Sequence, residues 1–295
     1  MLSDFTGVVV SNAAYVIIDS GVTCDWASMN LTAGGSGETR IRITDDTGIT
    51  FPATLTISEY TLEGDGISQT LANVVVDTDG VLTHHGPSTS QSAGLDLTLS
   101  GDLTLQNGGV VHGDEKGFTS GSSPNGSSDS RDNGTAHGGL GHANETGHEC
   151  YGSILAPDRS GGGAHEGHGG GAVKLAVAGQ TTIGSSSRIT ANASADNKYV
   201  AAAGGSVFLT TGSLTGSGPI EARAGYSSRH SSGGGRVSVV LTDPGATFQS
   251  YTGSGGSFAA YSSYGVNDGQ GSAGTIYLQT GDQANGTGEC IVDHN

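Results

Sequence analysis

The sequence predicts an all-β solenoid, a parallel β-helix, on the strength of three observations. Val, Ile and Thr occur in short runs separated by Gly, Ser, Asn and Asp, which is the composition of strands joined by turns. No segment concentrates the Ala, Leu, Glu, Lys and Gln that long helices need. A strand-and-turn unit also recurs with the same polarity in the C-terminal half, as expected for stacked coils.

Four copies of this unit align with one another, at Gly170 to Ala193, Gly204 to Gly225, Gly234 to Thr242 and Ala273 to Thr280. Each copy opens with small residues and continues as an alternating strand. The equivalent positions lie 34, 30 and 39 residues apart, and they are Val173, Val207, Val237 and Ile276. These periods fit a coil of two or three strands that carries a variable loop.

The N-terminal part contains shorter units of the same kind, at 15–24, 39–51, 53–66, 72–86 and 95–113. The alternation of Leu95, Leu97 and Leu99 turns one face of such a strand inward, which is what a solenoid coil buries. Strands joined by these turns also fit an antiparallel β-sandwich, which is the alternative fold. Units of one polarity with the same turn chemistry favour stacking over hairpin pairing.

We expect one domain over residues 1–295, divided into N-terminal coils at 1–118, a Gly/Ser/His-rich loop region at 119–170 and Gly-rich coils at 171–295. A loop of about fifty residues inside a compact domain is uncommon unless it is functional or ordered by a metal. The middle region is therefore where special chemistry is expected.

The C-terminal coils resemble the glycine-rich right-handed β-helix repeats of large bacterial extracellular proteins, also found in some polysaccharide-active enzymes. The matching stretches are 169–175, Leu214 to Gly225, Gly233 to Val240 and Ala273 to Thr280. The resemblance covers about half of the chain and carries over no catalytic motif. It implies a right-handed β-helix in an exported or virion-borne protein, as one module of something longer.

Charge and cysteine content narrow the function classes. The net charge of −17 argues against nucleic acid and anionic membranes as partners, because phosphate groups need a basic face.

The start, MLSDFTGVVV, lacks the features of a signal peptide, and no apolar run reaches transmembrane length. Cys24, Cys150 and Cys290 fit no CxxC metal pattern, and they allow either one disulfide with a free thiol or three reduced thiols.

Histidine and glutamate gather in the loop region and suggest a metal site. The spacing of His165, Glu166 and His168 is not that of a zinc-protease helix, which the surrounding glycines would break. A loop site for a zinc-like transition metal remains possible, and its candidate ligands are His137, His142, His148, Glu149, His165, Glu166 and His168. The alternative is a solvated polar loop.

Aspartate-rich turns suggest calcium as a second candidate ion. Asp45 and Asp46 lie in TDDTG, and Asp77 and Asp79 lie in VDTDG. Hard oxygen ligands in turns suit calcium, but Asp and Gly are also the ordinary residues of tight turns.

Two function classes follow. The first is a non-catalytic extracellular or virion-borne module that is structural or adhesive, contacting a polysaccharide or cell-surface glycan or a second copy of itself. Tyr251, Tyr261 and Tyr264 are its candidate sugar-stacking residues, although aromatic residues here would equally plug the edge of a coil. The second class is a polysaccharide lyase or glycoside hydrolase, with catalytic candidates Tyr151, Arg159, His148 and Glu149.

Overall fold

The computed structural model describes residues 9–10, 14–28, 30–31, 38–91, 94–124, 134–142, 149–165, 167–194, 198–262 and 270–293. Two large, mostly parallel sheets dominate this part of the chain, so the prediction of an all-β protein is confirmed. None of the helices in the described ranges is long and apolar enough to cross a membrane.

The first sheet has eight strands, and every neighbouring pair in it is parallel. In spatial order they are β2 (Tyr15–Ile18), β5 (Arg40–Ile43), β8 (Thr61–Glu63), β10 (Val81–Thr83), β13 (Val110–His112), β15 (Arg188–Thr190), β18 (Ile220–Glu221) and β21 (Phe258–Ala259).

The second sheet has nine strands and is parallel except for its last pair. In spatial order its main path is β7 (Thr54–Ile57), β9 (Asn73–Val76), β12 (Leu103–Leu105), β14 (Ala172–Ile183), β17 (Ser206–Gly216), β20 (Arg236–Leu241), β22 (Gly274–Gln279) and β23 (Glu289–Asp293). The ninth strand, β11 (Leu95–Leu99), pairs with β14 beside β12. Only the pair of β22 with β23 is antiparallel among the strands described in this sheet.

Six short strands form three further parallel pairs: β1 (Val9–Val10) with β4 (Asn30–Leu31), β3 (Cys24–Asp25) with β6 (Ile49–Thr50), and β16 (Lys198–Val200) with β19 (Ser227–His230). A 3-10 turn, η1 (Trp26–Ser28), and a single helical turn, α1 (Gln249–Thr252), complete the described elements.

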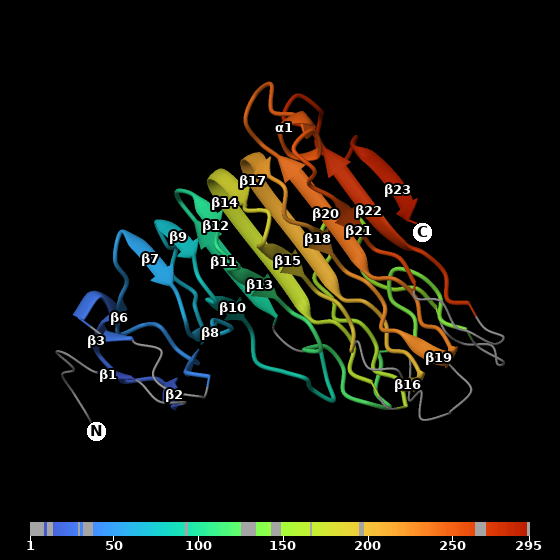
Figure 1. Cartoon of the computed structure of the whole chain (residues 1–295), viewed down its shortest axis with the longest axis horizontal. Helices are drawn as coiled ribbons and strands as arrows, with labels where there is room; N and C mark the ends of the chain where they lie inside the picture. The colour runs from blue at the N-terminus through green and yellow to red at the C-terminus, as the bar shows by residue number, and fades with distance from the viewer. Residues whose placement is uncertain are drawn as a thin grey trace.

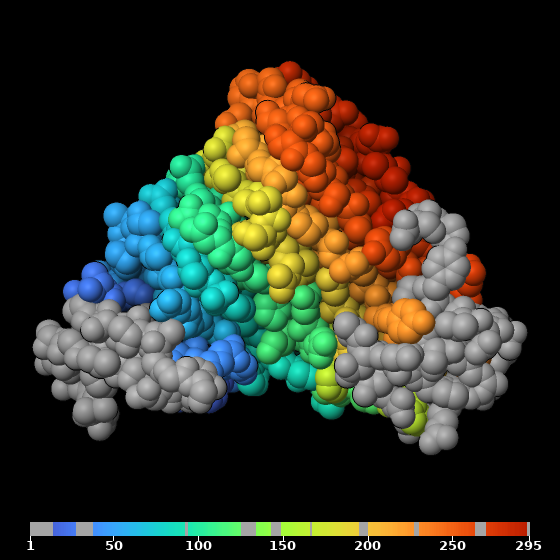
Figure 2. Space-filling view, in the orientation of Figure 1, coloured from blue at the N-terminus to red at the C-terminus, as the bar shows by residue number. Residues whose placement is uncertain are grey.

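From β5 to β22 the chain passes back and forth between the two large sheets, so sheet neighbours come from successive passes (Figure 1). Figure 2 shows the passes as bands that lie side by side, from blue to red. The register aligns Val173 with Val207, Val207 with Val237, and Val237 with Ile276. The alignment of the four sequence repeats is therefore confirmed residue by residue.

Apolar residues at alternate strand positions face the space between the two sheets. In the first sheet the register joins Val16, Ile41, Leu62, Leu82, Val111, Ile189, Ile220 and Phe258 into one row. These residues belong to or pack against a single hydrophobic cluster that includes the inner residues of the second sheet. The core therefore lies between the two sheets. Burying each such side chain stabilises the fold by about 1.5–3 kcal/mol.

The described parts of the predicted loop region are held mainly by backbone hydrogen bonds within a glycine cluster. We define this cluster as residues 117–121, 134–142, 161–165, 167–171, 201–205, 231–235 and 271–274. Gly161 N donates to Gly170 O at 2.8 Å, and Gly170 N donates to Ala203 O at 3.0 Å. A Cβ on Gly170 would lie 2.0 Å from the carbonyl oxygen of Ala191, so a larger residue cannot fit without moving backbone.

Candidate functional site

Polar residues cross the outer face of the eight-stranded sheet as a continuous row. Because strand side chains alternate, the residue after each inner apolar residue points outward. The register aligns these outer residues across six strands, from β5 to β18, as Arg42, Glu63, Thr83, His112, Thr190 and Glu221. We call this row, with the polar residues that contact it, the polar stripe.

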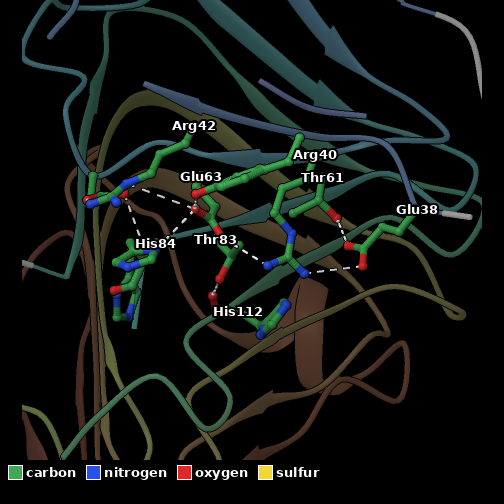
Figure 3. A network of polar contacts seen from close by, with 11 residues as sticks. Glu38, Arg40, Arg42, Thr61, Glu63, Thr83, His84 and His112 are labelled. Carbon is green, nitrogen blue, oxygen red and sulfur yellow. Dashed lines mark hydrogen bonds and ion pairs between the residues drawn. The ribbon is translucent and has the colours of Figure 1, made fainter. Parts of the chain in front are cut away.

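Glu63 is the centre of one half of the stripe (Figure 3). Its side chain is only 1% exposed, and four groups approach its carboxylate. Tyr15 Oη donates at 3.2 Å, Arg40 Nη1 donates at 3.3 Å, and Arg42 Nε lies at 4.0 Å. His85 Nδ1 lies 3.4 Å away. A buried carboxylate needs such partners, and removing one from a buried ion pair costs about 3–5 kcal/mol.

The two arginines beside Glu63 extend the network to further carboxylates. Arg40 Nη2 lies 3.2 Å from Glu38 Oε2, and Arg42 Nη2 lies 3.2 Å from Asp65 Oδ2. Lys116 also lies within electrostatic range of Glu63. Burial lowers the pKa of Lys116, whereas the charge of Glu63 opposes this change. This half of the stripe is a network of closely spaced cations and anions.

The other half of the stripe is a chain of hydrogen bonds that runs across the strands. Asp114 Oδ1 accepts from Asn192 N at 2.7 Å, and Asn192 Oδ1 accepts from Arg223 N at 2.7 Å. Arg223 then pairs with Glu221 at 2.8 Å and donates to Tyr261 Oη at 2.8 Å. Burial raises the pKa of Asp114. This chain of hydrogen bonds therefore links the segments that follow β13, β15 and β18.

Two histidines support the stripe: His84, which is fully buried, and His112, which is a partly buried member of the row. Burial lowers the pKa of His84 and that of His112 to about 4, so both rings are neutral at pH 7. His84 Nδ1 contacts His85 O at 2.9 Å, and a Cβ on Gly171 would lie 2.2 Å from His84 Nε2. His112 Nδ1 accepts from Asp114 N at 3.1 Å. These rings are structural supports of the stripe.

The stripe nearly balances its charges although the whole chain does not. It holds five of the 11 Lys+Arg residues of the chain, namely Arg40, Arg42, Lys116, Arg188 and Arg223. Six carboxylates accompany them: Glu38, Glu63, Asp65, Asp114, Glu115 and Glu221. The cations and anions of this face therefore nearly balance on a protein whose net charge is −17.

Tyr151 and Arg159, predicted as catalytic candidates, line one cleft of about 570 Å³ together with Gln91, Phe118, Pro124, Gly152, Ser153 and Asp158. An adjoining pocket of about 280 Å³ shares Arg159 and adds Asp96 and Lys174, which form an ion pair at 2.9 Å. Tyr151 Oη donates to Ser160 O at 2.8 Å. Burial raises the pKa of Tyr151, so the phenol keeps its proton at neutral pH and does not serve as a general base in this state.

The described histidines of the loop region have separate surroundings. His137 contacts Gly204 O at 2.7 Å, with its ring 4.8 Å from that of Tyr151, whereas His142 stacks on His230 at 4.9 Å. His168 Nδ1 accepts from Ser120 N, and the His165 carbonyl accepts from the hydroxyl of the same serine.

Glu149 is exposed, and His148 and Glu166 lie outside the described residues. Within the described ranges, no three His, Cys, Asp or Glu side chains are grouped so as to hold a metal ion. The transition-metal site therefore stays a prediction.

The aspartates predicted to bind calcium act as hydrogen-bond acceptors in turns. Asp45 Oδ1 accepts from Thr47 N at 2.8 Å, and Asp46 Oδ2 accepts from Ser68 N at 2.9 Å. Asp77 accepts from the backbone of Thr78 and from the side-chain amides of Gln106 and Asn107, and the backbone bond is the main reason that its pKa falls to about 2. Asp79 occupies a turn position with φ of 53°. Calcium at these turns stays a prediction.

The three tyrosines proposed to stack on sugars have different positions. Tyr251 is fully buried in α1 and donates from its hydroxyl to Gly218 O, so its ring does not face solvent. Tyr261 is half-buried at the end of the polar stripe, where the Arg223 guanidinium lies 5.6 Å from the ring centroid. Tyr264 lies outside the described residues.

Comparisons of the chain with protein-family models, with curated proteins and with solved structures found no match. The functional argument therefore rests on the residues of the polar stripe and on the cleft that Tyr151 and Arg159 line. The sequence prediction missed the stripe. The signal for it was the polar residue next to each inner apolar residue in RIRI, TLE, VLT, VVH, RIT and IE.

Proposed function

We propose that the chain is a right-handed parallel β-helix that serves as a non-catalytic extracellular or virion-borne module and binds a glycan along the polar stripe. Alternation of strands between two parallel sheets, with repeats in register, supports the solenoid. The observation that carries the function is the row of polar groups that spans β5 to β18.

The chemistry of the stripe favours an extended polysaccharide rich in hydroxyl groups. The side chains of Arg40, His85 and Arg223 are 38%, 50% and 37% exposed, and they offer hydrogen-bond donors at separate points along the stripe. Planar side chains such as Arg223, His85 and Tyr261 offer faces for sugar rings. The nearly balanced charge gives no preference for a polyanion, so we expect the affinity to depend little on salt.

Paired variants on the two sheets test this proposal. Changing Arg223 to alanine removes one ion-paired positive charge from the stripe. Changing Lys174 to alanine removes one from the nine-stranded sheet. We expect Arg223→Ala to weaken binding of a neutral soluble polysaccharide at least tenfold in calorimetry, and Lys174→Ala to leave it unchanged. Thermal melting of each variant provides the folding control.

Two outcomes would overturn glycan binding at the stripe. The first is that no member of a panel of neutral and acidic polysaccharides binds the parent chain. The second is that Lys174→Ala loses affinity while Arg223→Ala keeps it, because the ligand then occupies the cleft that Lys174 lines.

A polysaccharide lyase or hydrolase is the second candidate, and the shared cleft of Tyr151 and Arg159 is the observation that favours it. Incubation of the same panel with the protein tests it, with new reducing ends and ultraviolet absorbance of unsaturated products as readouts. Activity that Arg159→Ala abolishes, in a variant that melts like the parent chain, would replace the non-catalytic proposal with this one.

A further inference from the structure

Two cysteines from distant parts of the sequence share one charged neighbour. Cys150 and Cys290 are both exposed, and both thiols lie within electrostatic range of the Arg236 guanidinium. Arg236 Nε donates to the carbonyl of Tyr151, the residue after Cys150, at 3.0 Å. Its Nη1 donates to Thr275 Oγ1 on β22 at 2.9 Å. Arg236 therefore connects the segment that holds Cys150 to the strand beside Cys290.

Cys290 projects from the outer face of the nine-stranded sheet. In the antiparallel pair of β22 and β23 it lies directly opposite Tyr277, and Val292 lies opposite Thr275. Side chains two residues apart on a strand share a face, so Cys290 faces the same side as Thr275 and the Arg236 side chain bound to it.

The segment that carries Cys150 lies over this same face. Ser238 Oγ donates to Leu155 O at 2.7 Å, and Ser206 Oγ donates to Arg159 O at 2.6 Å. Leu155 also reaches the turn before β23, because its Cδ1 lies 3.7 Å from the position of a Cβ on Gly286. The two cysteines therefore belong to segments that already contact each other.

We propose that Cys150 and Cys290 are a disulfide-forming pair that joins the segment at residues 149–159 to β23. Cys24 is not part of the pair, because it is buried in β3, which pairs with β6 outside both large sheets. A disulfide requires that its two Cα atoms lie within about 7 Å of each other, so oxidation would hold residue 150 next to β23.

The oxidant is an external low-molecular-weight disulfide such as oxidised glutathione. One cysteine thiolate attacks a sulfur of this disulfide, forms a mixed disulfide and releases one small thiolate. The second cysteine, after losing its proton to water, attacks the mixed disulfide and releases the second small thiolate. Two protein thiols thus become one disulfide, and one small disulfide becomes two small thiols. Burial raises the pKa of Cys150, and the Arg236 charge opposes this change.

Thiol counting and peptide mapping test the pair on the full chain. After incubation with oxidised glutathione at pH 8, we expect the count of free thiols in denaturant to fall from three to one. Non-reducing digestion and mass spectrometry should show one peptide pair linked through Cys150 and Cys290. The melting temperature of the oxidised protein should exceed that of the reduced protein, because a cross-link constrains the unfolded chain.

Serine variants supply the controls. Cys24→Ser should still lose two thiols and gain thermal stability on oxidation, whereas Cys150→Ser and Cys290→Ser should form no internal link and show no gain. Three free thiols after oxidation, mixed disulfides alone, a link to Cys24 or cross-linked dimers on a non-reducing gel would each overturn the proposal.

Discussion

His84 illustrates how a single residue links the stripe to the glycine cluster. Its side chain is fully buried, and within the described residues its Nε2 has no hydrogen-bond partner. The ring lies against Gly113 and Gly171, where a Cβ would stand 3.2 Å and 2.2 Å from Nε2. A proton on Nε2 would therefore place a buried charge against the backbone of Gly113 and Gly171.

We expect the buried histidines to make the fold less stable in acid. Burial lowers the pKa of His84 to about 4, while the unfolded chain protonates histidine near pH 6.5. Below pH 6.5 the unfolded state then binds more protons, so stability present at neutral pH is lost progressively down to about pH 4. His84 alone accounts for about 2 kcal/mol between pH 7.5 and pH 5. Urea unfolding across this range measures the loss.

The neighbouring histidine provides the control for this effect. His85 is half exposed, so His85→Asn should keep the acid sensitivity of the parent chain, whereas His84→Asn should reduce it. His112 has its pKa lowered by burial to a similar value, so part of the sensitivity should remain in the His84 variant. A His84→Asn protein that folds and shows the unchanged pH slope would contradict the assignment.

At the scale of the strands, the inner rows were predictable from sequence and the outer row was not. Aligned repeats placed Val173, Val207, Val237 and Ile276 in one register, because inward apolar residues recur at the same point of each of these strands. The polar stripe has the spacing of the inner row one residue before it, but its members differ in type, so no recurring residue type marks it. Its residues Arg42, Glu63 and Thr83 are about twenty apart, and residues 113–189 separate His112 from Thr190.

The packing of the described parts of the loop region was not predictable from the sequence. Histidine and glutamate suggested a metal that orders it, whereas backbone-to-backbone hydrogen bonds order its described parts. Alternation of apolar and polar residues cannot indicate such packing, because glycine segments have no side chains to alternate. The cleft of Tyr151 and Arg159 could be anticipated only as two residues near each other in the sequence.

Two glycines of one segment test the packing of the glycine cluster. A Cβ on Gly170 would lie 2.0 Å from Ala191 O and 2.4 Å from Gly205 N, so backbone has to move. A Cβ on Gly167 would find its closest neighbour at 3.4 Å, an ordinary contact. We expect Gly170→Ala to lower the free energy of unfolding by about 3 kcal/mol or more, and Gly167→Ala by less than about 1 kcal/mol. Denaturant unfolding measures both, and equal costs would show that the cluster is loosely packed.

At the scale of the whole molecule, the two large sheets share one core, and β23 covers the C-terminal edge of the second sheet. An uncovered parallel edge presents a row of unpaired amides and carbonyls that recruits other strands. β23 runs antiparallel to β22, whereas the other described strands of this sheet run parallel to their neighbours. The residues of β23 are largely exposed. Its role in the described structure is to pair with β22 and end that sheet.

We expect removal of the chain from Glu289 onward to cause association between molecules. The truncation frees the edge of β22 and exposes Ile276 and Tyr277, which are each only 3% exposed in the intact chain. Light scattering during size-exclusion chromatography, at several concentrations, should show larger species than the parent chain forms. The matched control is Val292→Lys, which changes a residue that is 67% exposed but keeps the strand pairing, and it should behave like the parent. A truncated protein with the parent's size and melting temperature would show that β23 is not needed to protect the edge of β22.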